Sequence, residues 1–272
     1  MQQYWQNIYS NFDPVAFNIG QIAVHWYGIM YALALLSAIF IAKWFIKYDK
    51  INISNDIFDS YIWWAEIGVI LGARIGYVIF YDPNGSYYLT NPLQMFNPYS
   101  NGVYVGISGM SYHGAFIGFL LATYLFCKRK NISFWFISDI AVLGISAAYI
   151  FGRIGNFFNQ ELIGRVSDVP WAIYVDGVLR HPSQIYEAIL EGLVVFLILA
   201  YFRNKKSFDG QLAIMYGILY SSARIIAEFF RQPDIQLGFL AGEWLTMGML
   251  QSFVILFISL VLFTIRKKQV EN

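Results

Sequence analysis

Seven apolar stretches, each close to the length needed to cross a lipid bilayer, recur along this chain of 272 residues. The hydrocarbon core of a bilayer is spanned by about 20 apolar residues in a helix. Charged residues make up only 13% of the sequence, against about 25% in a soluble domain. The sequence therefore predicts an all-α integral membrane protein with about seven transmembrane helices in one domain, residues 1–272. We expect these helices at residues 22–46, 57–80, 112–127, 134–157, 184–202, 210–230 and 243–265.

The distribution of lysine and arginine predicts how the chain is oriented. One set of connections between the stretches carries twelve of them, around Lys47, Arg129, Lys205 and Lys267, and the opposite set carries three. Because cytoplasmic loops are enriched in Lys and Arg, we expect the N-terminus outside and the C-terminus in the cytoplasm. Two long external loops then fall at about 82–111 and 158–183. The second contains a possible short hairpin around Trp171–Leu179.

Composition also limits the classes of function. A net charge of +1 gives no indication of a nucleic-acid partner. The single cysteine, Cys127, excludes an intrachain disulfide framework, and the dispersed histidines show no metal-ligand spacing. We expect no metal and no cofactor. Residues 1–20 lack the basic start and apolar core of a secretory signal, and their aromatic residues are typical of a segment at the membrane interface.

An arginine follows directly on an apolar stretch, in the run Gly152–Gly164 after Phe134–Phe151. A guanidinium near the centre of a spanning helix costs about 2.5–3.5 kcal/mol on insertion scales, so Arg153 needs a partner or a function. Asn156, Asn159, Gln160 and Glu161 follow within eight residues. If Arg153 to Asn159 stays helical, Arg153, Asn156 and Asn159 (or Gln160) form one polar stripe.

The predicted orientation places most other ionisable residues of the spans at one depth, near the outer leaflet. His25 and Tyr27 begin the first span, and His113 begins the third. Glu187 and Glu191 fall in the outer half of the fifth span, and Arg224 and Glu228 in the outer half of the sixth. This convergence predicts a basic, hydrogen-bonding cavity at the level of the lipid headgroups, where guanidinium groups can bind phosphate.

Each of these features also has a purely structural explanation. Arg224 and Glu228 are one helical turn apart and could be a structural ion pair as readily as a site. Glu187 and Glu191 could simply cap neighbouring helices. Arg74 lies between Gly72 and Gly76 on a small-residue face, so we expect it to be structural. The coincidence of depth favours a site.

The run from Gly152 to Gly164 resembles the signature of prolipoprotein diacylglyceryl transferases, bacterial membrane enzymes that start lipoprotein maturation. The fixed positions of that signature are Gly152, Arg153, Asn156, Phe157, Asn159, Glu161 and Gly164, and all are present. The blocks His25–Gly28, Arg180–Glu187 and Arg224–Asp234 are also similar to the family, so the resemblance covers essentially the whole chain. The family's His-Gly-Gly and Met-Gly-Gln appear here as His113-Gly114-Ala115 and Met247-Gly248-Met249.

The resemblance implies a reaction and roles for individual residues. The diacylglyceryl group of phosphatidylglycerol would pass to the thiol of the lipobox cysteine in a prolipoprotein signal peptide, releasing glycerol-1-phosphate at the outer leaflet of the bacterial cytoplasmic membrane. Arg153 and Arg224 would stabilise the departing phosphate, and His113 or Glu228 would take the thiol proton. Substrate-binding roles are implied for Tyr27, His25, Asn156, Asn159, Glu161 and Gly164. The partners would be the lipid, the signal peptide and surrounding membrane lipids, with no nucleic acid.

A membrane carrier or channel for an anionic solute is the rival class. A carrier places polar groups along the whole transmembrane path, near the midplane and on both sides of it. Here the cytoplasmic halves of the predicted spans hold little beyond Asp139. The sequence therefore favours a site open to one leaflet.

Overall fold

The computed structural model describes residues 2–20, 22–82, 85–100, 103–104, 109–233 and 238–271. The protein is mostly helical and divides into two compact units, each described by itself. Unit 1 contains residues 1–51 and 138–272, and unit 2 contains residues 52–137. Parts of the predicted loop 82–111, at residues 83–84, 101–102 and 105–108, lie outside the described residues, as does Asp234.

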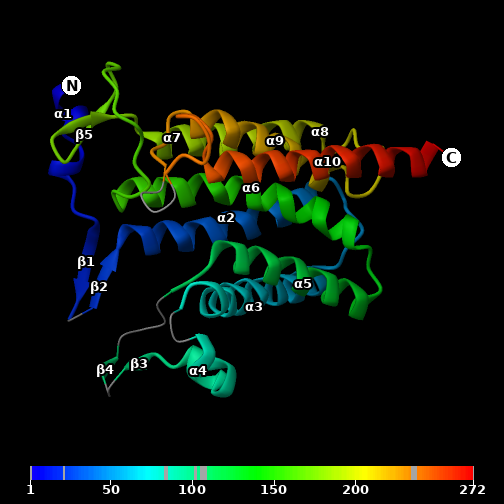
Figure 1. The fold of residues 1–272 in the computed structure, drawn as a ribbon. Helices are drawn as coiled ribbons and strands as arrows, with labels where there is room; N and C mark the ends of the chain where they lie inside the picture. The colour runs from blue at the N-terminus through cyan, green and yellow to red at the C-terminus, as the bar shows by residue number, and fades with distance from the viewer. Residues whose placement is uncertain are drawn as a thin grey trace. The chain divides into compact units, whose positions relative to one another are not determined.

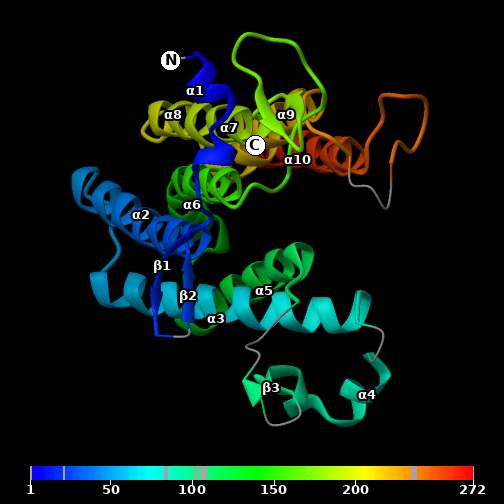
Figure 2. The same ribbon diagram turned by 90° about the vertical axis from the view of Figure 1, so that its left-hand side faces the viewer.

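Long helices make up most of unit 1, with α6 between α2 and a layer that contains α8 and α9 (Figures 1 and 2). The helix after the second long loop changes type twice, because a seven-residue π-helix separates α7 from α8. The bounds are α2 (Trp26–Tyr48), α6 (Phe134–Phe158), α7 (Ser183–Glu187), the π-helix (Ala188–Val194), α8 (Val195–Phe202), α9 (Gln211–Glu228) and α10 (Met247–Glu271).

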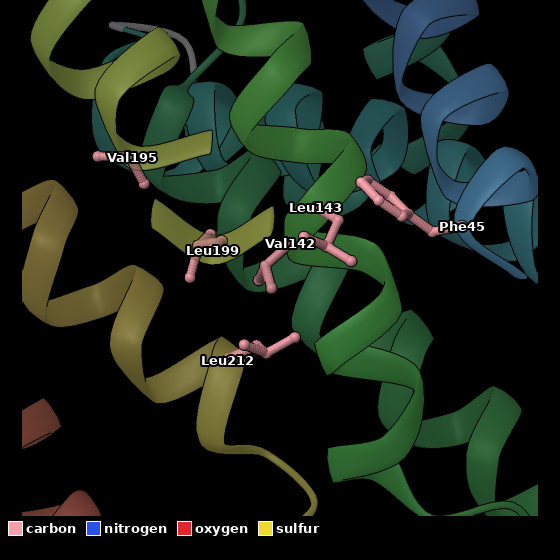
Figure 3. Close-up of a cluster of buried hydrophobic side chains, with 6 residues drawn as sticks. All are labelled: Phe45, Val142, Leu143, Val195, Leu199 and Leu212. Atoms are coloured by element: carbon pink, nitrogen blue, oxygen red, sulfur yellow. The ribbon is translucent and has the colours of Figure 1, made fainter. Parts of the chain in front are cut away.

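Interlocking apolar side chains hold these helices together. Figure 3 shows Leu143 of α6 pointing toward Phe45 of α2, and Val142 pointing toward Leu199 and Leu212 of α8 and α9. Leu199 is fully buried and Leu143 and Leu212 nearly so. Between helices in lipid, such packing stabilises through close van der Waals contact. The tight fit around α6 fixes this helix, which carries Arg153.

Unit 1 also contains short elements. The N-terminal segment forms α1 (Gln2–Gln6), a 3-10 turn (Tyr9–Asn11) and the hairpin β1 (Val15–Ile19) to β2 (Ile22–His25). The expected second hairpin is confirmed as β5 (Ile173–Val175) and β6 (Val178–Arg180). Its two loop residues, Asp176 and Gly177, have φ of +50° and +78°, as this tight hairpin turn requires. The side chains of Tyr9, Phe157 and Ile173 pack together, which joins the N-terminal segment, the end of α6 and this hairpin.

Unit 2 is built on two closely packed helices, α3 (Asn55–Phe80) and α5 (Tyr112–Lys130). A Cβ on Gly68 would lie 2.6 Å from the carbonyl oxygen of Gly118, and one on Gly76 would lie 2.7 Å from Gly114 Cα. Only glycine allows this approach, so the predicted small-residue face is confirmed. Between the two helices the described chain forms α4 (Gly85–Thr90), a 3-10 turn (Pro92–Phe96), β3 (Tyr99–Ser100) and β4 (Val103–Tyr104).

The expected structural role of Arg74 agrees with its contacts inside unit 2. Its Nε donates to the Met95 carbonyl at 2.5 Å and its Nη1 to the Gly109 carbonyl at 3.2 Å. Its guanidinium also lies 5.7 Å from the Tyr77 ring centroid. The side chain therefore ties the segment after α3 back to that helix.

Five described helices are long and apolar enough to cross a membrane: α2, α3, α6, the continuous run Ser183–Phe202, and α10. Helices also form at the two other predicted spans, as α5 and α9. Both are less apolar because α5 ends in Lys128-Arg129-Lys130 and α9 contains Arg224 and Glu228. Within unit 1, α1 and β5 lie at one end of the helices and the last turns of α10 at the other (Figure 1). The protein is thus a helical, multi-pass membrane protein.

Candidate active site

A buried carboxylate, Glu187, lies among three guanidinium groups at one end of unit 1. Its Oε2 is 3.0 Å from Arg153 Nη1 and 3.2 Å from Arg224 Nη1. Its Oε1 is 3.6 Å from Arg231 Nη1. The side chain of Glu187 is fully buried, and those of the three arginines are 11–15% exposed. One carboxylate therefore holds together cations from α6, from α9 and from the segment after α9.

Arg153 is held on three sides by residues of α6 and α7. Its Nε donates to the Tyr149 hydroxyl at 2.8 Å, and its Nη2 donates to the same oxygen. Its Nη1 donates to Asn156 Oδ1 at 3.3 Å, in addition to the ion pair with Glu187. The Asn156 amide in turn donates to Glu161 Oε1 at 2.6 Å. The predicted stripe is thus confirmed for Arg153 and Asn156, and it extends to Glu161.

Arg224 has two carboxylate partners in addition to Glu187. Its Nη2 donates to Glu228 Oε1, one turn further along α9, which confirms the predicted pair. Its Nη1 lies 3.5 Å from Glu191 Oε1. The other oxygen of Glu228 accepts a hydrogen bond from Thr246 Oγ1 at 2.6 Å. A Cβ on Gly248 would lie 2.7 Å from the carboxyl carbon of Glu228, so this glycine leaves room for the carboxylate.

The cluster is more nearly balanced in charge than the predicted basic cavity. The guanidinium groups of Arg153, Arg224 and Arg231 face the carboxylates of Glu187, Glu191 and Glu228. Buried charges are costly unless each is paired with an opposite charge. The acidic partners thus allow several arginines to lie side by side, with the planar groups held in fixed orientations.

Comparison with known proteins identifies the family. The family model described as prolipoprotein diacylglyceryl transferase matches residues 14–265. The chain belongs to this family. It is 77% identical over 266 residues to a phosphatidylglycerol–prolipoprotein diacylglyceryl transferase of Aliarcobacter butzleri, with 98% of each chain covered. It is 55% identical over 261 residues to the protein of that name from Campylobacter jejuni, with 96% of each covered. The resemblance inferred from the Gly152–Gly164 run is confirmed.

Two residues of the family signature, Asn159 and Gly164, make their contacts outside the arginine cluster. Asn159 follows the last residue of α6, and its backbone N–H donates to the Gly155 carbonyl at 2.9 Å. Among the described residues its side chain makes no hydrogen bond to the arginine cluster. Gly164 packs against the loop before α7, because a Cβ there would lie 2.8 Å from His181 Cβ. Its carbonyl accepts from Arg180 Nη1 at 3.1 Å. These contacts explain why position 164 needs glycine.

The first span contributes His25 and Tyr27 at the same end of unit 1. His25 is an exposed residue at the end of β2, directly before α2. Tyr27 is 41% exposed, and its ring lies 3.3 Å from where a Cβ on Gly155 would be. It is close enough to Glu161 and Arg153 to interact electrostatically with both. A partly exposed hydroxyl beside the arginine suits contact with a substrate.

His113 belongs to unit 2, in the first turn of α5. Its ring is exposed and contacts Tyr112 edge-on, with 5.9 Å between centroids. Ser111 begins the helix by accepting a hydrogen bond from the Gly114 N–H at 3.2 Å. The hydrogen bonds and ion pairs of the arginine cluster described above all come from residues of unit 1.

Sequence reasoning did not identify Tyr149 and Thr246, and it left Glu187 and Glu191 without a role. Tyr149 could have been found, because it precedes Arg153 by four residues and so shares its helix face. Thr246 lies 18 residues after Glu228 in a connecting segment, and no periodic pattern joins the two. Its role depends on how α10 packs against α9.

Proposed function

We propose that this protein transfers the diacylglyceryl group of phosphatidylglycerol to the thiol of the lipobox cysteine in prolipoproteins. The products are a thioether-linked lipid and glycerol-1-phosphate, and the reaction is the first step of bacterial lipoprotein maturation. The observation that carries the proposal is the network joining Arg153, Asn156 and Glu161 of the family signature to Arg224. Near-full-length similarity to relatives named for this activity supports it.

The chemistry calls for cations around a departing phosphate. The cysteine sulfur attacks the glycerol carbon that carries the phosphate ester, a C–S bond forms, and the C–O bond breaks with its electrons on the phosphate oxygen. Preorganised donors in a site with little water stabilise such developing charge better than water does. Arg153 and Arg224 are held 3.0 and 3.2 Å from one carboxylate oxygen, so they can act on one phosphate.

The thiol must lose its proton, and two residues compete for that task. With an ordinary pKa near 8.5, forming the thiolate at pH 7 costs about 2 kcal/mol. Both oxygens of Glu228 already accept hydrogen bonds, from Arg224 and Thr246. His113 is exposed, and a neutral imidazole has one nitrogen that can accept a proton. We keep both residues as candidates for the base, and Glu228 in addition orients Arg224.

The remaining signature residues are assigned to the substrate. Asn156 and Glu161 hold the headgroup or shape the loop around it, and Tyr27 donates a hydrogen bond to the phosphate or positions the diacylglycerol. His25, Asn159 and Gly164 complete the substrate-binding set. The protein is proposed to work without a cofactor or metal, since the phospholipid brings its own leaving group.

The proposed setting is the cytoplasmic membrane of a bacterium, with the active site facing the outer leaflet. All 272 residues form one catalytic domain with seven spans, an external N-terminus and a cytoplasmic C-terminus. The excess of Lys and Arg on one set of connections supports this orientation. Asp139, at the other end of α6, caps α9 and pairs with Lys206. Because Asp139 has this local role, it is not part of a row of polar groups across the whole membrane. A carrier would need such a row, so the role of Asp139 argues against that class.

A mass measurement on purified protein tests the proposal. The protein is incubated with phosphatidylglycerol and a lipobox peptide, and the peptide mass is followed. We expect a gain equal to one diacylglyceryl group, and no gain when serine replaces the peptide cysteine or when phosphatidylethanolamine replaces the lipid. A peptide that keeps its mass in the presence of folded protein would contradict the proposal.

A further inference from the structure

The hydroxyl of Tyr149 lies between Arg153 and Glu191, and the activity proposed above does not use it. It accepts from Arg153 Nε at 2.8 Å and from Nη2, and it donates to Glu191 Oε2. The guanidinium carbon of Arg153 also lies 4.8 Å from the Tyr149 ring centroid. The arginine is thus held both by the oxygen and by the ring of one side chain.

The direction of these hydrogen bonds is fixed by the groups themselves. A guanidinium only donates and an ionised carboxylate only accepts, whereas a tyrosine hydroxyl has one proton and free lone pairs. Tyr149 must therefore give its proton to Glu191 and accept from Arg153. The Tyr149 hydroxyl thus holds the edge of the Arg153 guanidinium formed by Nε and Nη2. Asn156 and Glu187 hold the opposite side, at Nη1.

The π-helix brings Glu191 to this position. Glu191 lies within the π-helix Ala188–Val194, next to Gly192. A Cβ on Gly192 would lie 2.6 Å from Ile150 Cγ1 and 3.1 Å from the Ile150 backbone nitrogen. The π-helix therefore approaches α6 at the residue after Tyr149, as only glycine permits. Such π segments inside α-helices are rare and are frequent at functional sites.

Glu191 connects the two arginines of the proposed phosphate site. Its side chain is fully buried. Its Oε2 accepts from Tyr149, which holds Arg153, and its Oε1 lies 3.5 Å from Arg224 Nη1. This second connection runs parallel to the one through Glu187, on the opposite edge of the Arg153 guanidinium.

We propose that Tyr149 and Glu191 are a pair of positioning residues that orient the Arg153 guanidinium, relative to Arg224, for the phosphate group of the lipid substrate. The inference rests on the proposed transferase function. Neither residue needs to contact the reacting atoms. A displacement of about 1 Å in a catalytic group can cost about 100-fold in rate, so a lost hydroxyl in this pair has a measurable effect.

Steady-state kinetics on three variants test this pairing. Tyr149→Phe removes the hydroxyl, Glu191→Gln removes the charge, and the double variant removes both. The matched control is Tyr201→Phe, the same change at an exposed tyrosine of α8. We expect Tyr149→Phe to lower kcat about 10- to 100-fold, with KM for phosphatidylglycerol changed less than about threefold. Tyr201→Phe should keep the wild-type kcat.

The double variant distinguishes a coupled pair from two separate effects. If both residues act through Arg153, the double variant should be no slower than the slower single variant. The proposal would be overturned if the fold-losses in kcat of the two single variants multiply in the double variant. It would also be overturned if Tyr149→Phe keeps the wild-type kcat. A fall in the midpoint of thermal unfolding of more than about 5 °C in Tyr149→Phe would assign the hydroxyl to stability and would also overturn it. An inactive wild-type protein would instead contradict the proposed function itself.

Discussion

At the scale of single residues, Glu187 explains how two arginines can lie close together inside the protein. Arg153 and Arg224 both contact the same oxygen of its fully buried carboxylate. Without that oxygen the two cations would repel each other in a medium that screens charge poorly. The structure thus gives a role to a residue for which the sequence left both a place in the site and simple helix capping open.

Replacing Glu187 by alanine should therefore affect both stability and catalysis. Removing one partner of a buried ion pair costs about 3–5 kcal/mol, because the other charges stay buried. We expect the free energy of unfolding in detergent to fall by about that amount and turnover to be lost. Glu271→Ala, at an exposed ion pair with Lys267, is the control and should change neither. Equal stability in the two variants would contradict the role assigned to Glu187.

The shape of the guanidinium should matter as much as its charge. Arg153 uses Nε, Nη1 and Nη2 for different partners, and a lysine ammonium cannot reproduce this geometry. Arg153→Lys should therefore reduce kcat by about 100-fold while the protein still folds. Kinetics at saturating phosphatidylglycerol measure this. If lysine supports a rate close to that of the wild type, positive charge alone is sufficient at this position.

Local spacing predicted some of these residue contacts and could not predict others. Arg224 with Glu228, and Arg153 with Asn156, are four and three residues apart, so their helix fixes the approach. The contact of Glu187 with both arginines joins three elements far apart in the sequence. It depends on packing between helices, which periodicity does not encode.

At the scale of elements, the buried side chain of Asp139 determines where α9 begins. Its Oδ2 accepts from the Gly210 N–H at 2.9 Å and its Oδ1 from the Ala213 N–H at 3.0 Å. Lys206 Nζ adds an ion pair at 2.8 Å. A carboxylate at this helix end binds free N–H groups and interacts favourably with the helix dipole. This fixes α9, and with it Arg224, from the end opposite the site.

Loss of this cap should reduce stability and leave the chemistry intact. Asp139→Ala should lower the free energy of unfolding by about 2 kcal/mol, the upper range for a helix cap. We expect a lower thermal midpoint in detergent and an unchanged kcat at a temperature where the variant is folded. Asp209→Ala, at a half-exposed carboxylate nearby, is the control. A reduced kcat in folded Asp139→Ala would show that the cap also affects the site.

The packing of α3 against α5 makes a second prediction at this scale. A Cβ on Gly118 would lie 2.8 Å from Gly72 Cα, whereas one on Gly152 would meet nothing within 4 Å. Gly118→Ala should therefore push the helices apart and lower the thermal midpoint. Gly152→Ala should leave it unchanged or raise it slightly, because alanine favours a helix by about 1 kcal/mol. Equal midpoints would contradict the close approach.

Sequence patterns predicted the elements unevenly. The hairpin around Trp171–Leu179 and the small-residue face near Gly72 were both predicted, because tight turns and close helix packing each have a direct geometric cause. The π-helix left no such signal, since the run from Ser183 to Phe202 simply resembles one apolar helix. The π-helix occurs where Glu191 and Gly192 contact α6, and those contacts depend on packing between helices.

At the scale of the whole molecule, composition and length predicted a helical membrane protein, and five described helices are apolar enough to cross a bilayer. The helix that carries Arg224 and Glu228 is less apolar because of these two charged side chains, and it is not among those five. The proposed orientation depends on the distribution of Lys and Arg.

Labelling of single cysteines checks that orientation. Cys127 is first replaced by serine, and a cysteine is then introduced at Gly177 in the second hairpin or at Asn204 between α8 and α9. We expect a membrane-impermeant thiol reagent to label Gly177→Cys in intact spheroplasts and to label Asn204→Cys only after lysis. The reverse pattern would place the site at the cytoplasmic leaflet.

The most direct test of the central claim is the single-turnover rate of thioether formation with phosphatidylglycerol saturating. Under that condition the rate reports stabilisation of the departing phosphate rather than lipid binding. We predict that Arg153→Ala and Arg224→Ala each lower this rate by about 1,000-fold, while Arg129→Ala, at an exposed arginine of α5, leaves it unchanged. A rate within about threefold of the wild type in either site variant would contradict the claim that this arginine pair drives the reaction.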